Sequence, residues 1–264
     1  MYAVLAQPMF PVSVENTKRL AGALACKKKS KMSVIPEYYQ RLACAYIRGK
    51  LGPGIAGDEA SRGLFDCPLD ALSQEEMQAL IRLGVEAGLR LHRFKRTMAL
   101  ARVQKVLGIL KGLHPASLLD IGSGRGAFLW PLLDAFPALP VTMLDLLDYR
   151  VADIQAVQAG GIERLSASQM DVTALGFADR SFDVVTMLEV LEHIPAAEKA
   201  LAEVCRVARR CLIVSVPSRP DDNPEHLHLF SEQRLRALLA SQGVRQVNAS
   251  YVLNHIVMVA TVGT

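Results

Sequence analysis

The sequence predicts an α/β fold of the doubly wound kind, in which helices cover both faces of a mostly parallel sheet. From Ala116 onward, short apolar strands alternate with helical segments, which is the pattern of parallel β-α units. A glycine-rich turn follows the first of these strands, and acidic residues end several of them. The chain has 264 residues, so one such domain leaves about 90 residues for a second region.

The glycine-rich turn is the most informative motif of the chain. An apolar run that contains Asp120 is followed by glycines at alternate positions: Gly122, Gly124 and Gly126. Glycine allows bare backbone to approach a ligand, and the spacing fits both a dinucleotide turn and a D-x-G-x-G-x-G turn that holds S-adenosylmethionine (SAM). A carboxylate beside the turn repels a diphosphate and attracts an ammonium group. Asp120 therefore favours SAM.

Acids at the ends of the next two predicted strands extend this interpretation. Asp145 ends the strand over 140–145, where it can accept hydrogen bonds from both ribose hydroxyls of an adenosine. Asp171 lies near the end of the strand over 165–172, where it can accept from an adenine amino group. Further strands are expected from residue 181 and over 208–217.

With these pieces in order, the chain resembles the class I SAM-dependent methyltransferases, especially the branch that includes ubiquinone-pathway O-methyltransferases. The motifs that carry the resemblance are LLDIGSGRGAF, VTMLD, MDVTALGF, SFDVVTMLEVLEHI and CLIVSVPS, and it covers about residues 95 to 262. It implies a Rossmann-like sheet of seven strands with one antiparallel edge strand, and methyl transfer from SAM.

The resemblance also implies the residues that bind SAM. The turn from Asp120 to Gly126 would hold the methionine part, Asp145 the ribose and Asp171 the adenine edge. Glu189 would lie beside the sulfonium, where the methyl group leaves. The full expected set is Asp120, Gly122, Ser123, Gly124, Gly126, Asp145, Leu146, Asp171, Val172 and Glu189.

A second group of chemistry-bearing residues follows the fourth and fifth strands. Glu189, Glu192 and His193 form an E-x-x-E-H motif, and His226 and His228 come later. One hypothesis is a divalent metal held by Glu189, Glu192, His193 and His228, with His226 almost equal to His228. Similar patterns occur in small-RNA 3′-end 2′-O-methyltransferases and in ubiquinone-pathway enzymes.

The same histidines have a metal-free interpretation. His193, His226 or His228 would then be the catalytic base for a hydroxyl acceptor, because imidazole titrates near neutral pH. In a purely structural interpretation, Glu192 and His193 cap the following helix and the late histidines line a pocket.

The predicted function is methyl transfer from SAM to an oxygen, or a nitrogen, of a small molecule, with oxygen favoured. Metal-assisted 2′-O-methylation of RNA is an alternative, supported by the basic residues that crowd the stretch from Arg90 to Lys105. A non-catalytic SAM-fold partner subunit is another. A nicotinamide-dependent oxidoreductase is disfavoured because no hydride-transfer acid–base pair is recognisable.

Composition and cysteine usage set the broad class. A net charge of +4 does not demand a nucleic-acid partner, and no apolar run reaches the ~18 residues that span a bilayer. The five cysteines are scattered without a C-x-x-C, which predicts reduced thiols and a cytoplasmic location.

Three regions are predicted along the chain. Residues 1–33 form a separate leader, in which Met32 is an alternative start. Residues 34–95 form a helical cap that packs over the C-terminal edge of the sheet and supplies the substrate pocket. Residues 96–264 form the SAM-binding domain. Local signals are a helix over 36–50, a capping box from Ser73 to Glu76, an N-cap at Ser231 and a closing hairpin over 244–252 and 255–262.

Overall fold

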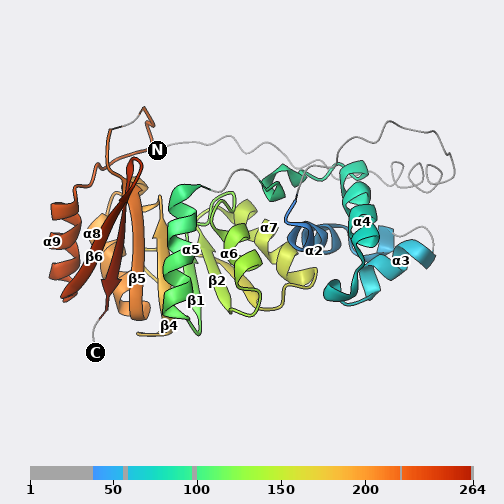
Figure 1. Cartoon of the computed structure of the whole chain (residues 1–264), viewed down its shortest axis with the longest axis horizontal. Coiled ribbons are helices and arrows are strands. Elements are labelled where there is room, and N and C mark those ends of the chain that lie inside the picture. The colour runs from blue at the N-terminus through green and yellow to red at the C-terminus, as the bar shows by residue number, and fades with distance from the viewer. Residues whose placement is uncertain (1–37, 56–58, 97–99, 221, 263–264) are drawn as a thin grey trace.

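The computed structural model describes residues 38–55, 59–96, 100–220 and 222–262 (Figure 1). Seven strands form one sheet in the order β3-β2-β1-β4-β5-β7-β6. Their bounds are β1 Leu118–Ile121, β2 Val141–Asp145, β3 Leu165–Gln169, β4 Phe182–Leu188, β5 Ala208–Pro217, β6 Gln246–Val252 and β7 His255–Thr261.

The order of the strands creates a topological switch point beside β1. Strands β1 to β5 run parallel, whereas β7 is antiparallel to both β5 and β6. The strand order departs from β1 in opposite directions, toward β2 on one side and β4 on the other. Ligands of open α/β sheets bind at such a switch point, outside the carboxyl ends of the strands. The predicted doubly wound sheet of seven mostly parallel strands is confirmed. The expected antiparallel edge strand is wrong in its place, because the antiparallel strand β7 lies between β5 and the edge strand β6.

Alternating side chains divide the core into two layers. Leu118 and Val184 pack with helices on one face, and their neighbours Leu119 and Val185 pack with helices on the other. The first layer contains α5 Ala101–Leu113, α6 Leu129–Ala135 and α7 Asp148–Ala159. The second contains α8 Ala197–Val207 and α9 Glu232–Ser241. The predicted alternation of strands and helices fails once, because turns alone join β3 to β4 over residues 170–181.

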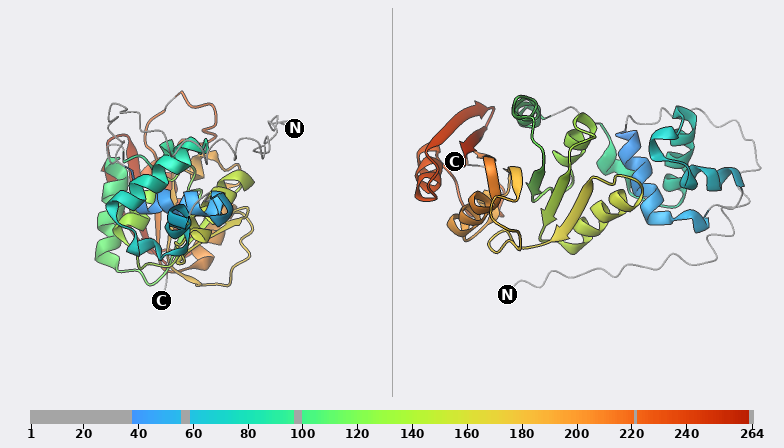
Figure 2. Two further views of the ribbon diagram at one scale, coloured as in Figure 1. Left: turned by 90° about the vertical axis from the view of Figure 1, so that its right-hand side faces the viewer. Right: turned by 90° about the horizontal axis from the view of Figure 1, so that it is seen from below.

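The N-terminal helices lie at one end of the molecule, beyond α7 (Figures 1 and 2). They are α2 Gln40–Leu51, α3 Glu59–Asp66 and α4 Gln74–Glu86, with short 3₁₀ turns η1 Pro53–Ile55, η2 Leu69–Ala71 and η3 Leu91–Phe94. The prediction that these helices pack over the C-terminal edge of the sheet is wrong, since α2 packs along α7. Glycines set this contact: a Cβ on Gly160 would lie 1.7 Å from the Ala45 carbonyl oxygen, and one on Gly49 would lie 1.9 Å from that of Ala156.

Several local predictions are confirmed. Ser73 and Glu76 form a reciprocal capping box at the start of α4, and the Ser231 side chain caps α9. The closing hairpin forms from β6 and β7. Residues 1–33, with Met32, lie outside the described residues. Within the ranges that the structure describes, no helix has the length and hydropathy needed to cross a bilayer.

Candidate functional site

The glycine turn after β1 is folded tightly against its neighbours. Gly122, Gly124 and Gly126 all have positive φ, at 68°, 56° and 83°. A Cβ on Gly126 would lie 2.1 Å from Trp130 Nε1, and one on Gly122 would lie 2.5 Å from Val190 Cγ2. Both positions therefore require glycine, for conformation and for space. The turn presents backbone at the switch point between β1 and β4.

Asp120 supports this turn from within. Its carboxylate is 1% exposed and accepts hydrogen bonds from Ser123 Oγ at 2.5 Å and Thr186 Oγ1 at 2.8 Å. Burial raises the pKa of Asp120 to about 6, although the two hydroxyl donors oppose that rise. Contact of Asp120 with the methionine part of a cofactor stays a prediction, because a carboxylate that accepts two hydrogen bonds keeps further lone pairs. Asp120 holds the turn through Ser123.

Asp145 joins the glycine turn to the start of α7. Its side chain is buried and accepts hydrogen bonds from the Gly124 N–H at 3.2 Å and the Leu147 N–H at 3.0 Å. Arg150 Nη1 lies 3.3 Å from the same carboxylate. The next residue, Leu146, is 64% exposed.

Asp171 and Val172 lie beyond the end of β3, which stops at Gln169 instead of continuing to residue 172. The strand ends early because Asp171 Oδ1 accepts from the Thr173 N–H at 2.8 Å and turns the backbone. That backbone hydrogen bond lowers the pKa of Asp171. The Met170 N–H donates to the Asp145 carbonyl at 3.3 Å, so the segment leading to Asp171 passes beside Asp145.

Glu189 follows β4 with a φ of 58°, which is rare for a residue with a side chain. Its Oε1 accepts from Ser215 Oγ at 2.5 Å, and its Oε2 lies 2.8 Å from His255 Nε2. Arg102 Nε is 3.8 Å from the same carboxylate. Sequence spacing did not indicate Ser215, His255 or Arg102 as partners, because they come from β5, β7 and α5, which only the tertiary fold brings together.

A separate cluster joins Glu192, His193 and His226, whose ligand-type atoms lie within 4.8 Å of one another. Glu192 is 1% exposed, and its carbonyl accepts from the N–H groups of Leu227 and His228 at 2.8 and 3.2 Å. These two hydrogen bonds dock the loop that carries His226 onto η4 Leu191–His193.

The predicted four-residue metal set is therefore not assembled. Glu189 is held by Ser215 and His255, and His228 Nε2 lies 3.1 Å from the Ile194 carbonyl oxygen. Of the two late histidines, His226 and not His228 joins Glu192 and His193.

Comparison with known proteins agrees with this geometry. Residues 119–211 match the family model described as "Methyltransferase domain". The chain is 27% identical over 169 residues to a malonyl-[acyl-carrier protein] O-methyltransferase of Geobacter sulfurreducens, covering 55% of this chain and 62% of the relative. It is 34% identical over 127 residues to a demethylmenaquinone methyltransferase of Renibacterium salmoninarum, covering 47% of this chain and 50% of that one. The matches thus span about half to three-fifths of these relatives.

A solved structure shares the fold. A SAM-dependent methyltransferase from Aquifex aeolicus superposes with a TM-score of 0.51 at 18% identity, over 61% of this chain and 97% of that chain. Fold, glycine turn and family match together define a class of protein, the class I SAM-dependent methyltransferases. Over the matched region the chain is similar to members of this family, as its sequence motifs predicted.

Proposed function

We propose that the protein transfers a methyl group from SAM to an oxygen of a small-molecule acceptor. The observation that carries the proposal is the glycine turn at the switch point, closed on one side by Asp145. The O-methyltransferase named among the relatives supports oxygen as the acceptor atom. A nitrogen acceptor is the second choice.

The residues around the turn fit SAM. The positive φ of Gly122, Gly124 and Gly126 lets the turn expose its backbone at the switch point, where the methionine part would bind. Asp145 offers the ribose two carboxylate oxygens once Arg150 yields its contact. The exposed Leu146 offers the adenine an apolar surface, and Asp171 and Val172 lie at the adjacent strand end. SAM supplies a sulfonium-bound methyl group, which transfers without further activation.

The base in this proposal is His193. Its Nδ1 lies 2.9 Å from the Glu225 carbonyl oxygen, and a carbonyl can only accept, so Nδ1 carries the proton. In the neutral ring, Nε2 then has a free lone pair that can take the proton of an acceptor hydroxyl. The neighbouring Glu192 carboxylate would stabilise the imidazolium that forms.

A metal-assisted form of the reaction uses the same cluster. Glu192, His193 and His226 provide one carboxylate and two imidazoles, a donor set that suits a divalent transition metal. The residues would hold the ion with solvent or acceptor oxygens completing its coordination, and it would lower the pKa of the acceptor hydroxyl. Metal-assisted RNA methylation remains the alternative for this form.

The experiment that tests the proposal is calorimetric titration with S-adenosylhomocysteine. The wild-type protein should bind it, and Asp145→Ala should bind at least about tenfold more weakly, because ribose hydroxyls lose their acceptor. Asp148→Ala, which removes an exposed acid three residues away, is the matched control and should bind normally.

Two outcomes would contradict the proposal. Absence of binding to the wild-type protein would favour the non-catalytic partner subunit. Equal affinity of wild type and Asp145→Ala would remove Asp145 from the cofactor site. Adding EDTA during an acceptor assay then separates the two forms of the reaction, because only the metal-assisted one should stop.

A further inference from the structure

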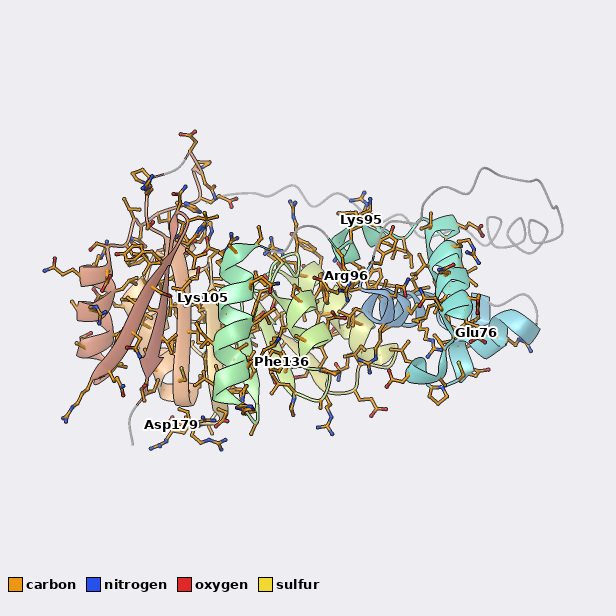
Figure 3. The ribbon with its side chains drawn as sticks, in the orientation of Figure 1. Glu76, Lys95, Arg96, Lys105, Phe136 and Asp179 are labelled. Atoms are coloured by element: carbon orange, nitrogen blue, oxygen red, sulfur yellow. The ribbon has the colours of Figure 1, made fainter. Side chains whose placement is uncertain are left out.

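A groove of about 690 Å³ lies beside the glycine turn, between that turn and the cap. Gly124, Gly126 and the exposed Tyr149 line it from the methyltransferase domain, and η3 lines it from the other side. Its volume is in the range of small-molecule sites. Figure 3 labels Lys95, one of its lining residues, on the segment between the cap helices and α5.

The lining of this groove is strongly basic. Among the described residues that form it, none is acidic. The basic members are Arg90, His92, Arg93, Lys95, Arg125 and Arg150. They come from η3 and its flanks, from the glycine turn and from α7, so basic residues of several elements line the same groove.

Two of the cations are neutralised and three are not. Arg93 pairs with Asp153, and Arg150 pairs with Asp145. Arg90, Lys95 and Arg125 are exposed, and within the described part of the chain no carboxylate forms an ion pair with any of them. Three positive charges thus face the groove without a partner, and their mutual repulsion is relieved when an anion binds.

We propose that this groove binds the phosphate group of the methyl acceptor, so that the acceptor is a phosphate-bearing small molecule. This inference rests on the proposed function. A single carboxylate would neutralise one charge, whereas a phosphate monoester or diphosphate carries two or more charges and several acceptor oxygens for guanidinium groups. The shared wall at Gly124 and Gly126 places that phosphate next to the cofactor turn.

The test measures binding of inorganic pyrophosphate by calorimetry in EDTA-containing buffer, without cofactor. Wild-type protein should bind it saturably, and the affinity should fall as salt is raised. The double variant Arg90→Gln/Lys95→Gln should bind pyrophosphate at least about tenfold more weakly. The matched control is Arg82→Gln, an exposed arginine on α4 that does not line the groove.

The same variants are titrated with S-adenosylhomocysteine to separate the inference from the proposed function. Loss of pyrophosphate binding with unchanged S-adenosylhomocysteine affinity supports the inference. No pyrophosphate binding to wild type, or equal binding to the double variant, overturns it, whatever the cofactor result. Weaker binding of S-adenosylhomocysteine alone overturns it too, because the groove would then serve the cofactor carboxylate. If a single-stranded RNA binds more than about a hundredfold tighter than pyrophosphate, the inference of a small-molecule acceptor is overturned in favour of RNA.

Discussion

Asp120 lies at the end of β1 with its carboxylate enclosed by Ser123 and Thr186. Burial raises its pKa to about 6 from an ordinary value of 3.8. Between these values the folded protein binds more protons than the unfolded chain, so the free energy of unfolding falls as pH rises from about 4 to about 6. The ionised carboxylate is thus held in the turn at a cost to stability.

Asp120→Asn should remove this pH dependence. Relative to the variant, wild type should lose stability as pH rises from about 4 to about 7. The loss, measured as the change in the difference between their free energies of unfolding, should be at most about 3 kcal/mol. Denaturant unfolding at several pH values measures it. Other titrating groups cancel in the difference, so curves that stay parallel would contradict the raised pKa.

His193 tests the chemistry of the site at the same scale. His193→Asn should lower turnover by about 10² to 10⁴, the usual effect of losing a positioned base, with S-adenosylhomocysteine affinity unchanged. His228→Asn is the matched control, because His228 bonds to the Ile194 carbonyl outside the cluster. Steady-state rates against a methylated acceptor provide the measurement, and an equal loss in both variants would exclude His193 as the base.

At the scale of elements, the packing of α2 on α7 determines where the cap lies. The Asp153 carboxylate on α7 accepts a hydrogen bond from Tyr46 Oη at 3.2 Å. It also forms ion pairs with Lys50, at 3.0 Å from Nζ, and with Arg93 from η3. Burial and the Asp153 charge raise the pKa of Tyr46 to about 12, so this tyrosine stays a hydrogen-bond donor. One carboxylate therefore joins two elements of the cap to the methyltransferase domain.

Asp153→Asn should loosen this junction. Removing the shared charge leaves Lys50 and Arg93 half-buried without their counterion, and we expect a loss of about 2–3 kcal/mol in the free energy of unfolding. Amide hydrogen exchange should become faster in α2, and the increase in β1 should be smaller. Asp134→Asn removes the more exposed pair with Arg96 and should cost less than about 1 kcal/mol. Unchanged protection of α2 would contradict the assigned role.

For the whole molecule, an aromatic row links cap and sheet into one folded body. The ring of Phe94 lies 5.2 Å from Tyr46 and 4.7 Å from Trp130, measured between centroids. Phe94 is fully buried, and Trp130 is a buried residue of α6. Since Trp130 is the only tryptophan of the chain, its fluorescence reports on this junction.

Phe94→Ala should cost about 3–5 kcal/mol in the free energy of unfolding, because a buried ring is replaced by a cavity. Tryptophan emission should shift to the red, and its denaturant transition should precede that of far-UV circular dichroism. In wild type both transitions should coincide. Phe177→Ala, in the opposite layer against Phe182, should lower stability without moving the emission. Coincident transitions in Phe94→Ala would show that the cap does not depend on this row.

Much of the methyltransferase domain was predictable because its determinants are local. Successive side chains of a strand point to opposite faces, which places Leu118 and Leu119 in different core layers. The glycines allow a turn with positive φ, in which other residues would be strained. The caps at Ser73 and Ser231 act within one helical turn. The fold class and the succession of strands and helices along the chain follow from such short-range patterns, whereas the order of the strands in the sheet comes from the tertiary structure.

Contacts between distant segments were beyond this reasoning. The partners of Glu189 come from β5, β7 and α5, and the choice of His226 over His228 depends on a loop docking on the Glu192 carbonyl. The place of the cap depends on close approach at Gly49 and Gly160, and the basic groove arises where η3 meets the glycine turn. Periodicity and spacing report on the secondary structure of a single segment. Which side chains meet across segments is decided by the shape and charge of the surfaces that the complete fold presses together.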